Sequence, residues 1–302
     1  MLEDGARGPC PACGRPVSGT RCGQCGTTRV AGRYLAIKVL GQRPFSRTYL
    51  ALDRKHDQHV VLKELWFAQV PSVVELKAFE REVALLRCVD HRRVPRLIKS
   101  FRLGDGPELR LYLVRAYVCG TSLATLTRRK PTEEPDAQHI ARQVLRVLMH
   151  LHAHSPPIIH RDLRPHHLLR CTNGAIHLLG FGAARWIEEG LTLEGTVVGR
   201  PGYASFEQLG GTLEPTADLH GLGATLLHLL TGVDPFELMP DGCRIEVPSD
   251  LAVTPHFKAF LRRLLAHPSK RYRSAEAAYA ALTTRNRVAE ALESAAAWLR
   301  RG

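Results

Sequence analysis

Short runs rich in β-branched and aromatic residues follow one another from residue 34 onward, with turn residues between them. YLAIKVL (34–40), RTYLALD (47–53) and HVVLKELW (59–66) have the composition of β-strands. RLIKSFRLG (96–104) and LRLYLVRAYV (109–118) share this composition, and a glycine-rich turn joins them. The pattern predicts a β-sheet in the first part of the chain.

Helical spacing of apolar residues interrupts these strands once, at 72–89, and dominates the chain after residue 120. The segment 136–155 predicts a long amphipathic helix, whereas 217–233 is apolar enough to be a buried one. A strand-rich half that precedes a helix-rich half is typical of an α+β fold. Further helices are expected at 255–268, at 274–284 and, rich in alanine, at 286–302.

Composition limits the class of protein. The chain has 302 residues, which suits one large domain or two smaller ones. Hydrophobic residues make up 44% and charged residues 24%, as in a soluble globular protein. No apolar run reaches the roughly 18–20 residues of a membrane helix, and the first residues lack the apolar core of a signal peptide. We therefore expect a cytoplasmic protein without a membrane partner.

The formal net charge of +13 is high enough to suggest nucleic acid or an anionic membrane as a partner. However, the basic residues are 34 Arg and 8 Lys, and they are scattered along the chain. The densest groups lie at 92–102 and 128–130, and both are interpreted as solvated surface. Charge alone therefore makes nucleic-acid binding a minor alternative.

Four of the eight cysteines form two CxxC pairs near the start of the chain, Cys10 with Cys13 and Cys22 with Cys25. Four thiolates in a tetrahedral array are a preferred shell of structural zinc. Residues 1–29 contain almost no large apolar residues, so metal binding would supply the folding free energy that this segment lacks. The segment resembles a zinc ribbon, and we expect a structural zinc ion with no open catalytic position; unrelated turns or a redox pair are the alternatives.

A second set of motifs is spread along the rest of the chain. IIHRDLRPHHLL (158–169) resembles the catalytic loop of protein kinases. VVLK places Lys63 on a strand, FEREVALL places Glu82 on the next helix, and GFG (180–182) follows the loop at a suitable distance. The chain is identified as a member of the protein kinase superfamily, similar to bacterial serine/threonine kinases. Three further residues match scaffold positions of that family: Glu207, Asp218 and Arg271.

This resemblance implies a two-lobed kinase-like fold over residues 30–285, between the zinc ribbon and the C-terminal helix. A strand-rich N-lobe would cover about 33–118 and a helical C-lobe about 119–285.

The resemblance also implies roles for individual residues. Lys63 would bind nucleotide phosphates and pair with Glu82. Asp162 would stand at the position of the catalytic base, next to Arg161, and Arg164 takes the place of the usual lysine of the loop.

The metal-binding positions of the family are altered. The aspartate of the DFG turn and the asparagine of the catalytic loop hold magnesium in the family, and this chain has Gly180 and His167 in their places. Glycine offers no ligand, and neutral imidazole is a poor ligand for an ion that prefers hard oxygen atoms. We therefore expect magnesium not to be held in the usual way, and Phe181 and Gly182 to serve packing and turn geometry.

The nucleotide-binding positions are altered as well. Only Gly41 remains of the glycine-rich loop, and Arg43 would obstruct the approach of phosphates to the backbone. Arg115 stands at the gatekeeper position, where a buried charge is costly unless it pairs with Glu82 or reaches the altered metal position. ATP binding is left open, and so is the alternative that Arg43 or Arg47 contacts phosphates.

Three hypotheses follow for the function. The leading one is a pseudokinase, which is a catalytically impaired regulatory module that binds a protein partner. The second is an active but atypical serine/threonine kinase that uses Asp162 as base, Lys63 on the phosphates of ATP, and Arg115 or Arg43 in place of metal charge. The third is a regulator that binds nucleic acid through the zinc ribbon.

Overall fold

The computed structural model describes residues 8–9, 16–17, 22–23, 28–66, 73–187, 200–212, 214–242 and 244–284. The chain divides into two compact units. The N-terminal unit comprises Met1–Asp90 and Pro95–Val118, and the C-terminal unit comprises His91–Val94 and Cys119–Gly302. The predicted helix at 286–302 lies outside the described residues.

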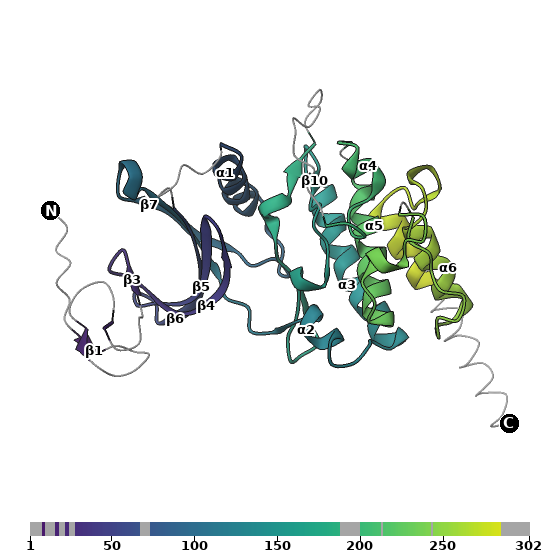
Figure 1. Cartoon of the computed structure of the whole chain (residues 1–302), viewed down its shortest axis with the longest axis horizontal. Coiled ribbons are helices and arrows are strands. Elements are labelled where there is room, and N and C mark those ends of the chain that lie inside the picture. The colour runs from purple at the N-terminus through teal and green to yellow at the C-terminus, as the bar shows by residue number, and fades with distance from the viewer. Residues whose placement is uncertain are drawn as a thin grey trace. The chain divides into compact units, whose positions relative to one another are not determined.

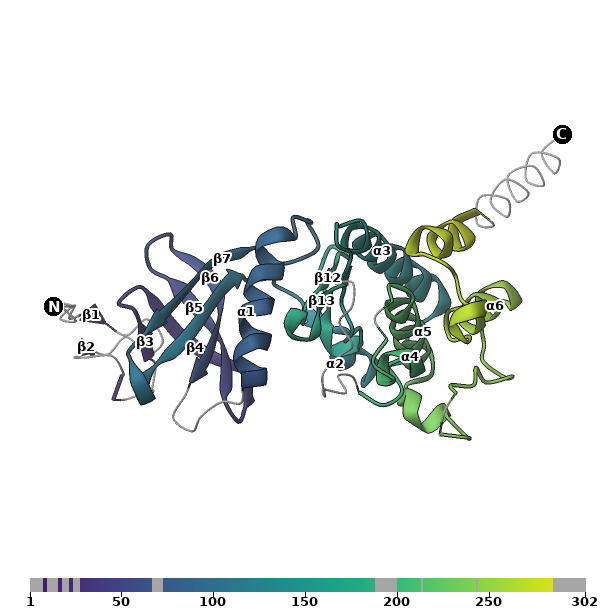
Figure 2. The same ribbon diagram turned by 90° about the horizontal axis from the view of Figure 1, so that it is seen from above.

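A six-stranded antiparallel sheet forms the N-terminal unit (Figure 1). The helix α1 (Val73–Cys88) lies beside this sheet and contacts β7 (Figure 2). The five predicted strands and the first predicted helix are present close to their predicted bounds. In the order of the sheet, the strands are β3 (Thr28–Val30), β4 (Tyr34–Arg43), β5 (Ser46–Asp53), β6 (Gln58–Trp66), β8 (Arg110–Ala116) and β7 (Leu97–Leu103).

The two faces of this sheet carry different residues. Directly paired residues of neighbouring strands share a face, and alternate residues along a strand do so too. Val61 pairs with Arg115, so Arg115 and Lys63 lie on the same face. The opposite face carries a buried cluster in which the rings of Tyr34 and Tyr112 stack on either side of Phe101, with centroid distances of 5.8 and 5.0 Å. The face with Lys63 and Arg115 thus also carries the buried Val61 and Leu113, and the opposite face packs an aromatic core.

Little of the predicted zinc ribbon falls within the described residues. The short strands β1 (Gly8–Pro9) and β2 (Pro16–Val17) pair with each other, and Cys22 is buried. Cys10, Cys13 and Cys25 lie outside the described residues, so the set of zinc ligands stays a prediction. The boundary drawn after residue 29 falls inside β3, because β3 pairs with β4 of the sheet.

Helices dominate the C-terminal unit. α3 (Glu134–His152) and α5 (Thr216–Thr231) pack against each other, and α6 (Pro255–Leu264) packs against α5 (Figure 1). α5 is buried over most of its length, as its apolar sequence predicts. A Cβ at Gly223 would lie 2.9 Å from the Cβ of Leu264, so this glycine allows α6 to approach α5 closely. The remaining helices are α2 (Leu123–Thr127), α4 (Phe206–Leu209) and residues 275–284.

Short elements between α3 and α5 carry the predicted catalytic loop. β9 (Thr121–Ser122), β11 (Leu168–Arg170) and β12 (Ile176–Leu178) form one small sheet, and β10 (Ile158–Ile159) pairs with β13 (Arg185–Trp186). Single 3₁₀ turns lie at Pro165–His167 and Phe181–Ala183, and others at Gly106–Glu108, Pro235–Leu238 and Pro268–Lys270. Among the helices of the described ranges, none is both long enough and apolar enough to cross a membrane.

Candidate functional site

In the N-terminal unit, Lys63 on β6 and Glu82 on α1 form an ion pair. Lys63 Nζ lies 2.5 Å from Glu82 Oε2, and Glu82 is only 8% exposed. Burial alone would raise the pKa of the Glu82 carboxyl, but the charge of Lys63, with those of Arg115 and Arg43, lowers this pKa below its ordinary value. The carboxylate therefore stays ionised and joins the helix to the sheet.

Arg115 adds a second positive charge to the face of the sheet that carries Lys63. The charges of Arg115, Arg43 and Lys63 all act on the single carboxylate of Glu82. Three cations around one anion leave an excess of positive charge. Such an arrangement is chemically suited to phosphate groups, because guanidinium and ammonium groups bind phosphate oxygens through charge-assisted hydrogen bonds.

A β-hairpin with two register shifts, between Ala36 and Lys38 and between Val39 and Gly41, replaces the glycine-rich loop. β4 continues through Gly41 to Arg43, and Arg43 pairs with Ser46 at the start of β5. A Cβ on Gly41 would meet nothing within 4 Å, so no close approach requires a glycine there. Arg47 pairs across the strands with Glu64, which points away from the Lys63 face, and its guanidinium lies 5.5 Å from the centre of the Trp66 ring. This position does not fit a phosphate contact from Arg47, whereas Arg43 remains available for one.

In the C-terminal unit, Asp218 on α5 anchors the start of the catalytic loop. Its carboxylate accepts hydrogen bonds from the backbone N–H groups of His160 and Arg161, both at 2.8 Å, and from His152 Nε2 at 3.0 Å. Asp218 is 1% exposed. Burial alone would raise the pKa of its carboxyl, but these donors lower it. Asp218 therefore sits where the resemblance implies a scaffold residue, and it ties the loop to the helical core.

Arg161 has a left-handed backbone conformation, with φ of 67°, which is rare for a residue other than glycine. Its N–H donates to Asp218, and its carbonyl oxygen accepts a hydrogen bond from Gln208 Nε2 at 2.8 Å. These buried bonds offset a strain of about 1–3 kcal/mol. They hold the sharp bend from which Asp162 follows.

Asp162 is paired within its own loop. Arg164 Nε lies 3.0 Å from Asp162 Oδ1, and His167 Nδ1 lies 3.4 Å from Asp162 Oδ2. The Asp162 side chain keeps 18% of its surface exposed. The carboxylate is thus oriented by the arginine that replaces the usual lysine, and it can still accept a proton from a group that reaches it.

His167 fills the space beside Gly180. Its Nδ1 donates a hydrogen bond to the backbone carbonyl oxygen of Asp162 at 2.7 Å. A Cβ at position 180 would lie 2.5–2.7 Å from atoms of the imidazole ring, and the φ of Gly180 is 88°. Any side chain at position 180 would therefore clash with His167 and strain the backbone. The two departures from the family pattern depend on each other structurally.

His167 is neutral near physiological pH. Burial lowers the pKa of its imidazole to about 4, although the nearby carboxylate of Asp162 opposes this shift. With its proton on Nδ1, the ring leaves only the lone pair of Nε2 as an acceptor. It supplies neither a positive charge nor an oxygen ligand at this position.

The residues at these positions do not fit magnesium. The ion demands near-octahedral coordination, mostly by oxygen. Gly180 has no side chain, His167 offers nitrogen, and Asp162 is already paired with Arg164. Within the part of the chain that the structure describes, no group of three or more His, Cys, Asp or Glu residues is arranged to hold a metal ion.

Two further contacts stabilise the C-terminal unit around the catalytic loop. Phe181 is buried, and its ring meets that of His160 edge-on at 5.1 Å, as expected if the Phe-Gly pair serves packing. Arg271 Nη1 lies 2.5 Å from Glu207 Oε1 and also donates to the carbonyl oxygen of Thr216 at 2.9 Å. Both groups brace the C-terminal unit without taking part in metal binding.

Comparison with known proteins agrees with this arrangement. The family model of the protein kinase domain matches residues 34–280. The chain belongs to the protein kinase domain family. It is 32% identical over 276 residues to serine/threonine-protein kinase F of Synechocystis sp., which covers 84% of this chain and 55% of that kinase. It is also 32% identical over 212 residues to serine/threonine-protein kinase PrkC of Bacillus subtilis, which covers 69% of this chain and 32% of that kinase.

Serine/threonine-protein kinase PknA of Nostoc sp. is a third relative, 32% identical over 262 residues, with 80% of this chain and 45% of that kinase covered. The chain thus spans from about a third to just over half the length of these relatives. The two-lobed kinase fold, with a strand-rich N-terminal sheet and a helical C-terminal part, is shared with this family.

Sequence reasoning missed two features of this kinase domain. It interpreted His167 and Gly180 as a joint loss of metal ligands, but it did not predict that the imidazole of His167 lies in the space beside Gly180. It also interpreted Arg92 and Arg93 as solvated surface, which agrees with the exposure of Arg92, but it did not predict that both line a pocket together with Arg146 of α3. No local signal in the sequence links these arginines, because the fold alone brings α3 to the segment that carries Arg92 and Arg93.

Proposed function

We propose that this kinase domain is an atypical serine/threonine protein kinase that relies on an unusual set of positive charges. The observation that carries the proposal is the Lys63–Glu82 ion pair, with Arg115 on the same face of the sheet. The names of the relatives, all serine/threonine-protein kinases, support it further. An oriented lysine beside an arginine supplies two cations for the phosphates of ATP.

In this proposal, a serine or threonine hydroxyl oxygen of a protein substrate attacks the γ-phosphorus of ATP. The hydroxyl proton passes to the carboxylate of Asp162, and the bond from the γ-phosphorus to the bridging oxygen breaks, so that ADP leaves with the electron pair. Lys63 and Arg115 neutralise charge on the phosphates, and Arg164 orients Asp162. Magnesium has no assigned role, because the residues at positions 167 and 180 do not fit it.

The test is transfer of labelled phosphate from ATP to a generic protein substrate, with and without EDTA. We expect transfer that persists in EDTA, and a loss of about 10²-fold or more in Asp162→Asn, because a general base contributes at least that factor. Lys63→Met should lose transfer as well, whereas Lys38→Met, which removes an exposed lysine of β4, should not. Equal transfer by the wild type and by Asp162→Asn would contradict the proposal.

A second candidate is a catalytically impaired kinase domain that serves as a regulatory module for a protein partner. The observation that favours it is the imidazole of His167 packed beside Gly180. This function predicts no transfer in the wild type or in any variant of the same assay, and no magnesium-dependent thermal stabilisation by ATP. Transfer that depends on Asp162 would exclude it.

We also propose that residues 1–29 bind one structural zinc ion through Cys10, Cys13, Cys22 and Cys25. The spacing of the two CxxC pairs supports this proposal. Nucleic-acid binding through this segment is the third candidate function. It predicts salt-sensitive binding of DNA or RNA that disappears when the ribbon cysteines are replaced by serine.

A further inference from the structure

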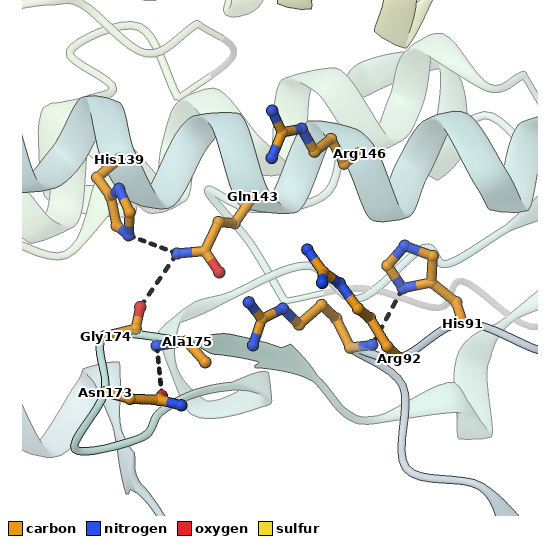
Figure 3. Close-up of a pocket in the computed structure, with 9 residues that line it drawn as sticks. His91, Arg92, His139, Gln143, Arg146, Asn173, Gly174 and Ala175 are labelled. Atoms are coloured by element: carbon orange, nitrogen blue, oxygen red, sulfur yellow. Dashed lines mark hydrogen bonds between the residues drawn. The ribbon is translucent and has the colours of Figure 1, made fainter.

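A pocket of about 230 Å³ lies in the C-terminal unit, and none of the catalytic loop residues described above is among its lining residues (Figure 3). Three segments that are distant in the sequence form it: residues 91–93, helix α3, and the turn at 173–175. Gln143 and Arg146 come from α3, and Arg92 comes from the facing segment (Figure 3).

The lining of this pocket is basic. Arg92, Arg93 and Arg146 contribute three permanent positive charges, His91 and His139 lie beside them, and no carboxylate lines the pocket. Elsewhere in the described residues, arginines such as Arg33, Arg170 and Arg271 pair with carboxylates, but none of the ion pairs found there includes the three pocket arginines. The pocket therefore holds concentrated positive charge that the described chain does not neutralise.

Neighbouring contacts fix the pocket in place. Gln143 Nε2 donates to the carbonyl oxygen of Gly174 at 3.0 Å, and Gln143 Oε1 accepts from the N–H of Ile176 at 3.0 Å. These two bonds hold the turn against α3. Arg146 Nη2 donates to the hydroxyl of Tyr279 at 2.6 Å, and its guanidinium lies 5.3 Å from the centre of that ring. One edge of the Arg146 guanidinium is thus positioned by Tyr279, and its other donors remain for a ligand.

We propose that this pocket binds a phosphate group, carried either by free phosphate or by a phosphorylated serine or threonine side chain. Arginine forks match phosphate oxygens in bidentate fashion, and a dianion satisfies three arginines better than a single carboxylate does. The volume suits a compact anion, since it lies below the roughly 300–1,000 Å³ of sites for drug-sized ligands. The proposal does not rest on the proposed kinase activity.

Phosphate binding here has a structural consequence. His91–Val94 belongs to the C-terminal unit, although the chain on both sides of it belongs to the N-terminal unit. The carbonyl oxygen of Arg93 already accepts a hydrogen bond from the N–H of Leu178 at 2.9 Å. That bond links the segment to β12, and a phosphate held between Arg93 and Arg146 adds a further link, from the segment to α3. Bound phosphate therefore stabilises the position of residues 91–94, the segment between the two parts of the N-terminal unit.

The experiment measures saturable binding of inorganic phosphate and of O-phosphoserine to the full chain by calorimetry at constant ionic strength. We expect binding by the wild type that is weakened tenfold or more in Arg93→Gln and in Arg146→Gln. Arg262→Gln removes an exposed arginine of α6 and should bind as the wild type does. Lys38→Met, which removes an exposed lysine of β4 in the N-terminal unit, should also bind normally.

Two measurements keep the outcome interpretable. The melting temperatures of Arg93→Gln and Arg146→Gln without phosphate show whether each variant is folded, and Arg93→Gln leaves the Arg146–Tyr279 contact intact. Tighter binding of O-phosphoserine than of phosphate would support a protein-borne phosphate as the ligand, and equal binding would support the free ion. Absence of saturable binding by the wild type, or an equal loss in Arg262→Gln, would overturn the proposal.

Discussion

The two ends of the catalytic loop are built from different chemistry. At its start, the buried carboxylate of Asp218 accepts hydrogen bonds from two consecutive backbone N–H groups, those of His160 and Arg161. At its far end, the neutral imidazole of His167 packs on the bare backbone of Gly180. The first end retains the scaffold aspartate that the resemblance implies, whereas the second has lost both oxygen ligands of the family.

The difference shows that the shape of the loop and its metal chemistry are held by separate groups. Asp218 acts through backbone hydrogen bonds, which do not depend on what the far end of the loop coordinates. His167 in turn bonds the carbonyl oxygen of Asp162 and fills the volume beside Gly180. The loop can therefore keep its course while its ligands change.

The largest expected effect lies at the start of the loop. Asp218→Ala should lower the free energy of unfolding by about 3–5 kcal/mol, because it leaves buried donors without an acceptor and releases the strained Arg161. Urea unfolding followed by circular dichroism measures the change. Asp250→Ala, at an exposed position, is the matched control and should stay within about 0.5 kcal/mol of the wild type. An equally small loss of unfolding free energy in Asp218→Ala would contradict the proposal that Asp218 anchors the loop.

The next effect lies at the far end. Gly180→Asp should cost about 2–4 kcal/mol of unfolding free energy, because it adds both backbone strain and a clash with His167. Gly242→Asp isolates the strain, since Gly242 has φ of 69° and open space around it, and it should cost less.

The same position offers a double-mutant cycle. In a His167→Ala background the ring atoms that make the clash are absent, so Gly180→Asp should cost less by about 1–3 kcal/mol. The separate double variant His167→Asn/Gly180→Asp restores both family ligands, and we expect it alone to show magnesium-dependent thermal stabilisation by ATP. Additive costs of the two substitutions would show that the positions are independent.

A smaller effect concerns pH and a buried histidine next to the anchor. Burial, aided by the charge of Arg271, lowers the pKa of His220 from 6.5 to about 4. The unfolded chain takes up this proton as the pH falls through 6.5, and the folded chain does so only near 4. The contribution of neutral His220 to the free energy of unfolding is therefore complete above pH 6.5. It is lost as the pH falls toward 4, by at most about 1.4 kcal/mol per pH unit.

Unfolding in urea at several pH values between 4 and 7 measures this slope. His220→Leu should flatten it, because the titrating group is gone. His59→Gln, at an exposed position of β6, should leave the slope unchanged. A slope that is the same in His220→Leu and in the wild type would place the pH dependence elsewhere, with His167 as the next group to replace.

The smallest effect on this comparison is expected from the ribbon. Plasma mass spectrometry should find one zinc ion per chain, and the double variant Cys10→Ser/Cys13→Ser should lose it. The unfolding free energy of the kinase domain should change by less than about 0.5 kcal/mol, since both cysteines precede the residues 34–280 that match the kinase domain model. The double variant Cys88→Ser/Cys119→Ser, which replaces two exposed cysteines outside the CxxC pairs, is the control and should keep its zinc content.

The elements that carry the site were predictable, because their patterns are local. Lys63 is on a strand and Glu82 on the following helix, as strand-like composition and helical spacing predicted. The position of Arg47 was not predictable, because which face of a hairpin a residue takes depends on the register of β5 against β6. The packing of His167 on Gly180 was likewise hidden, since it depends on a turn with positive φ that the sequence does not display.

Local order along the chain was enough to establish the strands, the main helices and the membership of the kinase family, because burial imposes a period on each element and the motifs are contiguous. Contacts between distant segments were established only by folding: the bonds of Asp218 to the loop, the imidazole seated on Gly180, and the arginines gathered from two segments around one pocket. Such contacts depend on how helices and turns pack in three dimensions, and no period or motif within a single segment encodes that packing.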